Sequence, residues 1–263
     1  MLFYKSLFRC AGLTLLLVVS SMILKAQSAG TGNYYEIKVY HFKTPVQEGI
    51  LDSYLKNAYL PMLHKKGFTN VGVLKPVETD TADRKIYVFI PFKNWKALEK
   101  FNASAEEPNA FATNTQDYTN AAYNKAPYSR IETIILTAFV TRPHPSAIKL
   151  TGERAKRVYE LRSYESPTEA LNFNKVRMFN SGETDLFDRL NFNSVFYGNV
   201  IAGSKMPNLM YLTTFNDKAD RDKHWDAFVK DAQWKDLSTR KEFQNSVSKA
   251  EITFLYPTDY SDF

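Results

Sequence analysis

The sequence has 263 residues, of which 44% are hydrophobic and 14% aromatic, enough to form one large core or two ordinary ones. Its formal net charge is +6, but Lys5, Arg9 and Lys25 lie within the first 26 residues, and without them 31 basic residues face 28 acidic ones. No Arg-rich run or basic stripe is present, which excludes nucleic acid as an expected partner.

The N-terminus has the pattern of a secretory signal peptide. Lys5 and Arg9 precede a largely apolar stretch of 14 residues, 11–24, and a polar run follows Ala26. We therefore expect residues 1–26 to be removed near Ala26, giving a periplasmic or extracellular protein with no membrane contact; an uncleaved anchor is the alternative. Cys10 is the only cysteine, so the exported protein would have no disulfide or cysteine nucleophile.

The rest of the chain repeats itself at a shift of 124 residues, which falls to 119 near the end. The matched segments are Tyr35-Glu36-Ile37 with Tyr159-Glu160-Leu161, Phe68–Val71 with Phe192–Val195, Tyr87 with Tyr211, and Glu132 with Glu251. This repeat predicts two copies of one structural unit, residues 27–140 and 157–263, joined by a linker over 141–156.

Each copy predicts a strand, a helix, two strands, a helix and a final strand, the ferredoxin-like order β-α-β-β-α-β. The expected strands are 35–40, 70–74, 85–90 and 131–139, then 157–164, 194–200, 209–215 and 251–256. Helices are expected after the capping boxes at 44–47 and 166–169 and from Asn94 and Asp217. The first should be disrupted at Pro61 and end near Gly67, and residues 103–125 predict a helix with loose ends.

A ferredoxin-like sheet carries helices on one face, so its other face must be buried against something. The sequence therefore predicts an α+β protein in which two tandem ferredoxin-like units pack sheet to sheet as an intrachain dimeric α/β barrel. Alternation along the two opening strands separates apolar from polar residues. We expect the polar face to line the space between the sheets; its residues are Glu36, Lys38 and Tyr40, and Glu160, Arg162 and Tyr164.

The opening strand of the second copy, Tyr159-Glu160-Leu161-Arg162-Ser163-Tyr164, resembles the Tyr-Glu-Leu-Arg-Thr-Tyr opening of the NIPSNAP family. The stretches 224–228 and 231–234 add to the likeness, which covers 157–256 and is faint over 34–139. The resemblance implies a member of the dimeric α/β-barrel superfamily, exported and bacterial. Since the biochemical activity of the family is not settled, it implies fold more than function.

The predicted inward face has two interpretations. Buried charges are costly unless paired or hydrated, so Glu160 and Arg162 could line a pocket for a polar or anionic small molecule. Alternatively, the same residues form salt bridges that hold the two copies in register.

His224 is the second candidate, because a histidine near the cleft of such a barrel can act as acid, base or haem ligand. The plainer interpretation is a packed histidine with one satisfied nitrogen. The other histidines show no metal-ligand spacing, and no nucleophile elbow or phosphate loop is present. The sequence therefore assigns no catalytic residue, and it predicts no metal and no cofactor.

The resulting hypothesis is an exported NIPSNAP-like protein of undefined activity that binds a small molecule or a protein partner. The alternative is a small-molecule enzyme of the dimeric α/β-barrel type, either cofactor-independent and monooxygenase-like or haem-dependent. Further oligomerisation is left open.

Overall fold

The computed structural model describes residues 32–105 and 116–263. The predicted signal peptide and part of the weakly patterned stretch 103–125 lie outside these residues. Among the described helices, none has the length and apolar composition needed to cross a membrane.

In each copy the strands and helices follow the predicted order β-α-β-β-α-β. The strands are β1 (Tyr34–Phe42), β2 (Gly72–Pro76), β3 (Arg84–Phe92), β4 (Arg130–Ala138), β5 (Val158–Glu165), β6 (Phe196–Ala202), β7 (Asn208–Phe215) and β8 (Lys249–Pro257). The helices are α1 (Pro45–Tyr54), α2 (Leu60–Lys65), α3 (Trp95–Ala105), α4 (Gln116–Thr119), α5 (Glu169–Met178), α6 (Thr184–Arg189), α7 (Lys218–Lys230) and α8 (Ala232–Thr239). Short 3₁₀ turns occupy Arg154–Lys156 and Lys241–Phe243.

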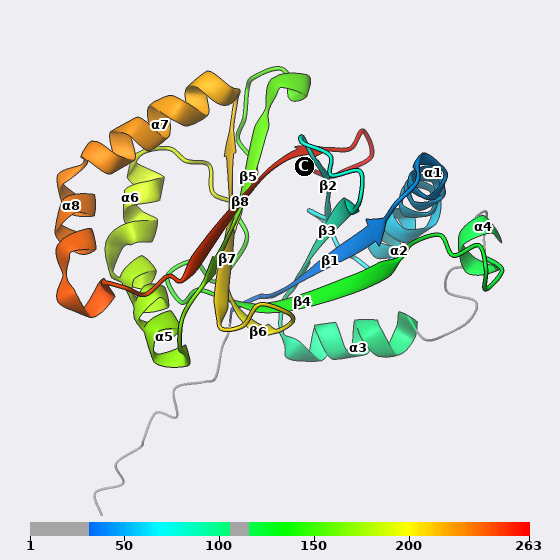
Figure 1. Cartoon of the computed structure of the whole chain (residues 1–263), viewed down its shortest axis with the longest axis horizontal. Helices are drawn as coiled ribbons and strands as arrows, with labels where there is room; N and C mark the ends of the chain where they lie inside the picture. The colour runs from blue at the N-terminus through cyan, green and yellow to red at the C-terminus, as the bar shows by residue number, and fades with distance from the viewer. Residues whose placement is uncertain (1–31, 106–115) are drawn as a thin grey trace, which may run out of the picture.

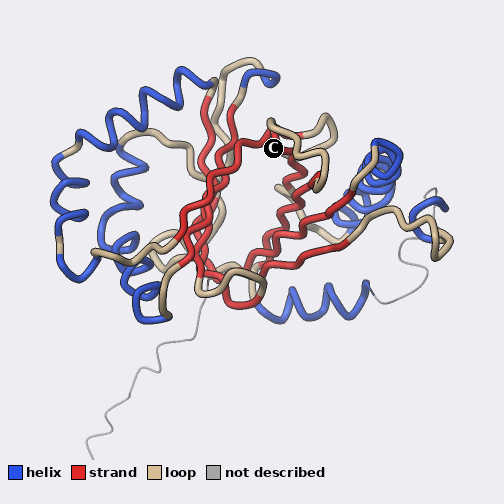
Figure 2. The backbone as a smooth tube through the Cα atoms, in the orientation of Figure 1, coloured by secondary structure: helices blue, strands red, loops and turns tan. Residues whose placement is uncertain are grey.

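The strands form one closed antiparallel barrel in the order β1-β3-β2-β8-β5-β7-β6-β4. Each copy contributes a four-stranded ferredoxin-like sheet, and the two sheets join edge to edge where β2 pairs with β8 and β4 pairs with β6. Helices α1–α4 lie outside one half of the barrel and α5–α8 outside the other (Figures 1 and 2). The predicted intrachain dimeric α/β barrel is thereby confirmed, with hydrogen-bonded edges that the sequence did not specify.

The strand registers confirm most of the sequence repeat. Val39 pairs with Glu132 as Ser163 pairs with Glu251, so the shift of 124 in the first strand and 119 in the last is structurally real. The match of Tyr87 with Tyr211 is wrong by one residue. Lys38 opposes Val88 whereas Arg162 opposes Tyr211, so Val88 is the true equivalent of Tyr211, and Tyr87 faces the other side of the sheet.

The helix that follows each opening strand is interrupted by a π-helical turn at the same place in both copies, Leu55–Tyr59 and Phe179–Glu183. In the first copy it directly precedes Leu60 and Pro61, so the predicted disruption is confirmed. The Thr44–Gln47 capping box is present. The predicted box at Ser166 is absent, because the Ser166 hydroxyl is buried and donates to the carbonyl of Ser246, and Thr168 caps the helix instead.

The barrel interior holds a core contributed by both copies, in which Tyr35, Ile37 and Val39 meet Tyr159 and Leu161. The polar residues of these two strands point the other way, toward the helices. The prediction that Glu36, Lys38, Tyr40, Glu160, Arg162 and Tyr164 line the space between the sheets is therefore wrong. Both faces of each sheet are buried, and the apolar face of the two opening strands fills the barrel.

Candidate functional site

The two ends of the barrel interior differ in chemistry. One end is closed by aromatic rings, with Phe89 stacked on Phe196 at 4.8 Å between ring centroids and Tyr35 and Phe263 beside them. The other end lies where β1 and β5 finish and where β3, β4, β7 and β8 begin. We call this polar end the barrel mouth.

A cavity of about 60 Å³ lies at the barrel mouth. Its floor is apolar and consists of Val39, Ile134, Leu161 and Met210, all buried side chains from both copies. Polar groups form its walls and rim: Lys85, Tyr87, Glu132, Ser163, Ser204, Lys205, Asn208, Glu251 and Thr253. An apolar floor with a few convergent polar groups is typical of small-molecule sites. We call this space the mouth cavity.

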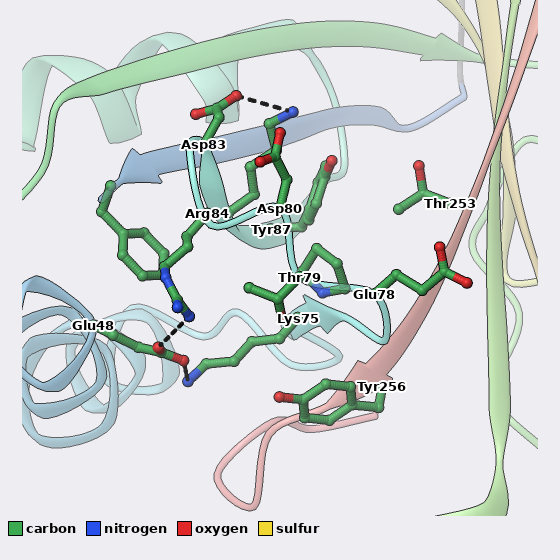
Figure 3. A pocket seen from close by; sticks show the side chains of 13 residues that line it. Glu48, Lys75, Glu78, Thr79, Asp80, Asp83, Arg84, Tyr87, Thr253 and Tyr256 are labelled. Atoms are coloured by element: carbon green, nitrogen blue, oxygen red, sulfur yellow. Dashed lines mark hydrogen bonds and ion pairs between the residues drawn. The ribbon is translucent and has the colours of Figure 1, made fainter. Parts of the chain in front are cut away.

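A second hollow, of about 160 Å³, adjoins the mouth cavity beneath the β2–β3 loop. The two share Lys85, Tyr87 and Thr253. Figure 3 shows this loop pocket, with Lys75 and Arg84 directed at Glu48 on one side and Tyr87 and Thr253 on the side of the barrel. Desolvation, with smaller effects from nearby carboxylates, raises the pKa of Tyr87 to about 12, so its hydroxyl is neutral at physiological pH.

On the side of the first copy, a chain of polar contacts runs around the barrel mouth. His41 Nδ1 lies 2.8 Å from Asp83 Oδ1, and its Nε2 lies 3.6 Å from Glu132 Oε2. Lys85 also contacts Asp83, at 3.2 Å. Partial burial opposes ionisation of Asp83, but His41 and Lys85 outweigh it and hold the pKa of Asp83 below its ordinary value. This carboxylate is therefore charged at neutral pH.

On the side of the second copy, Glu251 is the centre of the contacts. Lys205 and Lys249 approach its two carboxylate oxygens at 2.5 and 2.7 Å. Their hydrogen bonds lower the pKa of Glu251. Glu251 is the repeat equivalent of Glu132, so two equivalent carboxylates, one from each copy, stand at the rim of the mouth cavity.

The predicted residues of the second copy form a buried brace between the sheet and α7, outside the barrel. Glu160 has no exposed side-chain surface and accepts hydrogen bonds from Arg162 Nε at 2.7 Å, Arg221 Nε at 2.8 Å and Trp225 Nε1 at 2.9 Å. The Arg162 guanidinium stacks 3.7 Å from the Trp225 ring centre. Arg162 Nη1 also donates to the Tyr164 hydroxyl at 2.8 Å.

Burial alone would make ionisation of Glu160 unfavourable. The hydrogen bonds from Arg221 and the charges of both arginines outweigh this penalty, so the pKa of Glu160 lies below its ordinary value. The brace therefore holds a carboxylate with two guanidinium groups. It also corrects the second sequence interpretation, because these salt bridges fasten α7 to its own sheet and do not bridge the two copies.

The equivalent residues of the first copy are arranged more loosely. Glu36 is 1% exposed, and its nearest cation, Lys38 Nζ, lies 3.4 Å away; neither carboxylate oxygen accepts a hydrogen bond. Lys38 Nζ lies 3.4 Å from the Tyr59 hydroxyl. Tyr40 is buried among aromatic rings, and its ring centre lies 6.0 Å from the ring centre of Tyr128. None of these three residues lines the mouth cavity.

His224 matches the plainer sequence interpretation. Its Nδ1 lies 2.6 Å from the carbonyl oxygen of Asp220, and its ring packs against Phe192 and Phe215. It is remote from the barrel interior, so the alternative role as an acid, base or haem ligand in the cleft has no support in its position. Within residues 32–105 and 116–263, no group of three or more His, Cys, Asp or Glu side chains could hold a metal ion.

Sequence reasoning missed the residues of the barrel mouth. Asp83 and Glu132 lie 42 and 91 positions after His41, so no local spacing connects them. The usable signal was alternation: His41 continues the series Tyr35, Ile37 and Val39 to the end of the strand and must therefore face the barrel.

Residues 159–262 match the NIPSNAP family model. The structure of a candidate monooxygenase from Lactobacillus acidophilus NCFM is similar over 86% of this chain and 94% of its own, with a TM-score of 0.54 and 15% identity. A candidate monooxygenase from Fusobacterium nucleatum subsp. nucleatum matches over 86% and 92%, with a TM-score of 0.53 and 10% identity. At such identities the likeness establishes the barrel fold alone.

A NIPSNAP-like domain protein from Burkholderia xenovorans matches over 40% of this chain and 89% of its own, with a TM-score of 0.36 and 19% identity. A comparison with curated proteins found no match.

Proposed function

Starting from a NIPSNAP domain over residues 159–262 within a barrel closed by both copies, we propose that the protein binds a small amphipathic molecule in the mouth cavity. The observation that carries this proposal is the combination of an apolar floor with a charged rim. A ligand with a compact apolar body would rest on Val39, Ile134 and Leu161. Its polar substituents would meet Tyr87, Asn208 and Thr253.

The site is formed by both copies together, which explains the use of a tandem chain. Val39 and Ile134 come from the first copy, and Leu161 and Met210 from the second. Because the floor exists only when the barrel is closed, a single ferredoxin-like unit could not provide it.

Binding is tested by thermal-shift screening against phenols, aromatic carboxylic acids and short-chain fatty acids. A ligand at a hundred times its dissociation constant adds about 2.7 kcal/mol to the stability of the folded state. Thr253→Trp places a large ring where the two hollows meet and should abolish the shift. Ile252→Trp is the matched control, because Ile252 is the neighbouring residue on β8, points away from the barrel and is 44% exposed. A shift that persists in Thr253→Trp, or the absence of any shift in the wild type, would contradict the proposal.

A second function, acid–base catalysis on the bound molecule, is favoured by the contact between His41 and Asp83 at the barrel mouth. A carboxylate that accepts from one imidazole nitrogen orients the ring and stabilises it when protonated. This corresponds to the cofactor-independent enzyme of the dimeric α/β-barrel type. His41→Gln should then abolish conversion of the bound molecule, as measured by mass spectrometry. The thermal shift caused by binding should remain. Equal turnover by wild type and variant would remove this function.

We also propose that the protein is exported and that its leader is cleaved near Ala26. Expression in a Gram-negative host, followed by mass measurement of the periplasmic protein, should give a chain that begins at Gln27. A full-length mass in the membrane fraction would instead indicate a retained anchor.

A further inference from the structure

The wall of the mouth cavity has one part that does not belong to a strand. Ser204 and Lys205 lie in the turn between β6 and β7, residues 203–207, whereas every other described lining residue lies on a strand of the barrel. The strands are fixed by ladder hydrogen bonds on both sides. This turn is therefore the part of the wall that can move without opening the barrel.

Two side-chain contacts hold the turn in place across the barrel mouth. The Ser204 hydroxyl donates to Glu132 on β4, and Lys205 Nζ lies 2.5 Å from Glu251 on β8. These carboxylates belong to different copies, so the turn is fastened to both sides of the opening. Both contacts are partly exposed, and such contacts are individually weak and sensitive to salt. They suit a fastening that opens and closes.

The turn is closely packed at its base and exposed at its tip. Gly203 has φ of +144° and Lys205 has φ of +63°, values that most side chains disfavour. A Cβ on Gly203 would also lie 3.3 Å from the Ile134 Cα. Beyond this point Met206 is 50% exposed, so the tip of the turn is held more by its polar contacts than by burial.

We propose that the 203–207 turn is a gate over the mouth cavity, latched by Ser204 to Glu132 and by Lys205 to Glu251. The gate controls access to the binding site of the proposed function and in that sense rests on it. The β2–β3 loop of the first copy, residues 77–83, lines the loop pocket and contributes no residue to the lining of the mouth cavity.

Other charged groups act on the same carboxylates and provide the controls. Lys249, which lies on β8 like Glu251, contacts this carboxylate at 2.7 Å. His41, which lies on β1, is 3.6 Å from Glu132. Lys249→Ala therefore removes one positive charge from Glu251, as Lys205→Ala does, without touching the turn. If the turn is a gate, Lys205→Ala should make the cavity more accessible and Lys249→Ala should not. If only the charge near Glu251 matters, both variants should change the access equally.

The test measures access to the cavity without a ligand. Cys10→Ser removes the only native cysteine, and Ser163→Cys then places a single thiol in the cavity wall, where Ser163 is 7% exposed. Its reaction rate with N-ethylmaleimide reports opening. Adding Ser204→Ala and Lys205→Ala should raise the rate about fivefold, as expected when weak exposed contacts of this kind are lost. Adding Lys249→Ala should leave the rate within a factor of two, and salt should accelerate only the latched protein.

Three results would overturn the gate. They are an unchanged rate in the Ser204→Ala and Lys205→Ala protein, an equal acceleration by Lys249→Ala, and rapid labelling of the latched protein at the rate of a free thiol. Since no ligand is involved, failure of the gate is distinguishable from failure of the proposed function, which the thermal-shift screen decides.

Discussion

The two copies place the same strand pattern in different surroundings. In the second, α7 presents Arg221 and Trp225 to Glu160, four and eight residues after its N-cap Asp217. In the first, the positions four and eight residues after the cap at Asn94 are Leu98 and Asn102. Glu36 therefore has Lys38 as its only close cation among the described residues. A repeated motif therefore does not carry its role with it, since the role depends on what the covering helix provides.

Neutralising Glu160 should cost far more stability than neutralising Glu36. Glu160→Gln leaves two guanidinium groups without their counter-charge beneath α7, and removing one partner of a buried pair costs about 3–5 kcal/mol. Glu36→Gln should change the free energy of unfolding by less than about 1 kcal/mol, because Glu36 accepts no hydrogen bond and Lys38 can reach solvent. Urea denaturation of both variants measures the difference. Similar losses would refute the proposed contrast.

Acid should erase that contrast. The pKa of Glu160 in the folded protein lies below its ordinary value of 4.5. Its contribution to stability is therefore complete above that value and is lost as the pH falls through the folded pKa. The gap in free energy of unfolding between wild type and Glu160→Gln should stay constant from about pH 7 to pH 4.5 and narrow as the pH falls further. A gap that does not narrow there would show that geometry, and not charge, accounts for the loss.

Arg221→Leu converts the covering helix of the second copy to the pattern of the first. It removes two hydrogen bonds to a charged acceptor while Arg162 remains, and we expect a loss of about 2 kcal/mol. Lys218→Leu is the control on the same helix, since its pairing with Asp222 is largely exposed and such pairs contribute less than about 1 kcal/mol. Equal effects of the two variants would mean that Arg221 acts as a surface residue.

The smallest expected effect comes from the reverse exchange. Lys38→Arg places a guanidinium group beside Glu36, as Arg162 does beside Glu160. Its donors can reach the Glu36 carboxylate. We expect a gain of up to about 1 kcal/mol in thermal unfolding experiments. Lys93→Arg at an exposed position should change nothing measurable. A loss of stability in Lys38→Arg would show that the space beside Tyr59 accepts only the slimmer lysine.

Much of the fold was predictable from sequence because it is repeated. The shift between Glu132 and Glu251 predicted the register of the last strand in each copy, and Thr44 and Asp217 predicted two helix starts. The helix after Ser166 was predicted, but its N-cap is Thr168 and not Ser166. A local pattern does not show that the Ser166 hydroxyl binds the Ser246 carbonyl instead.

The site was harder to predict for a physical reason. Alternation shows that a strand has two different faces, but here both faces are buried, one by helices and one inside the barrel. Charged residues were therefore assigned to the wrong side. Beneath α7, Arg221 and Trp225 join Arg162 as the partners of Glu160. The barrel mouth depends on His41, Asp83 and Glu132 meeting across three segments, which no local pattern encodes.

The closure of the barrel has a consequence for biosynthesis. β2 and β4 are edge strands of the first copy, and their partners β8 and β6 are translated much later. Until those strands emerge from the ribosome, a first copy that has already folded exposes two unpaired edges, which invite pairing with other chains. Non-local pairing of this kind also slows folding. A chain that begins to fold only after translation is complete would have all four of these strands available to pair at once.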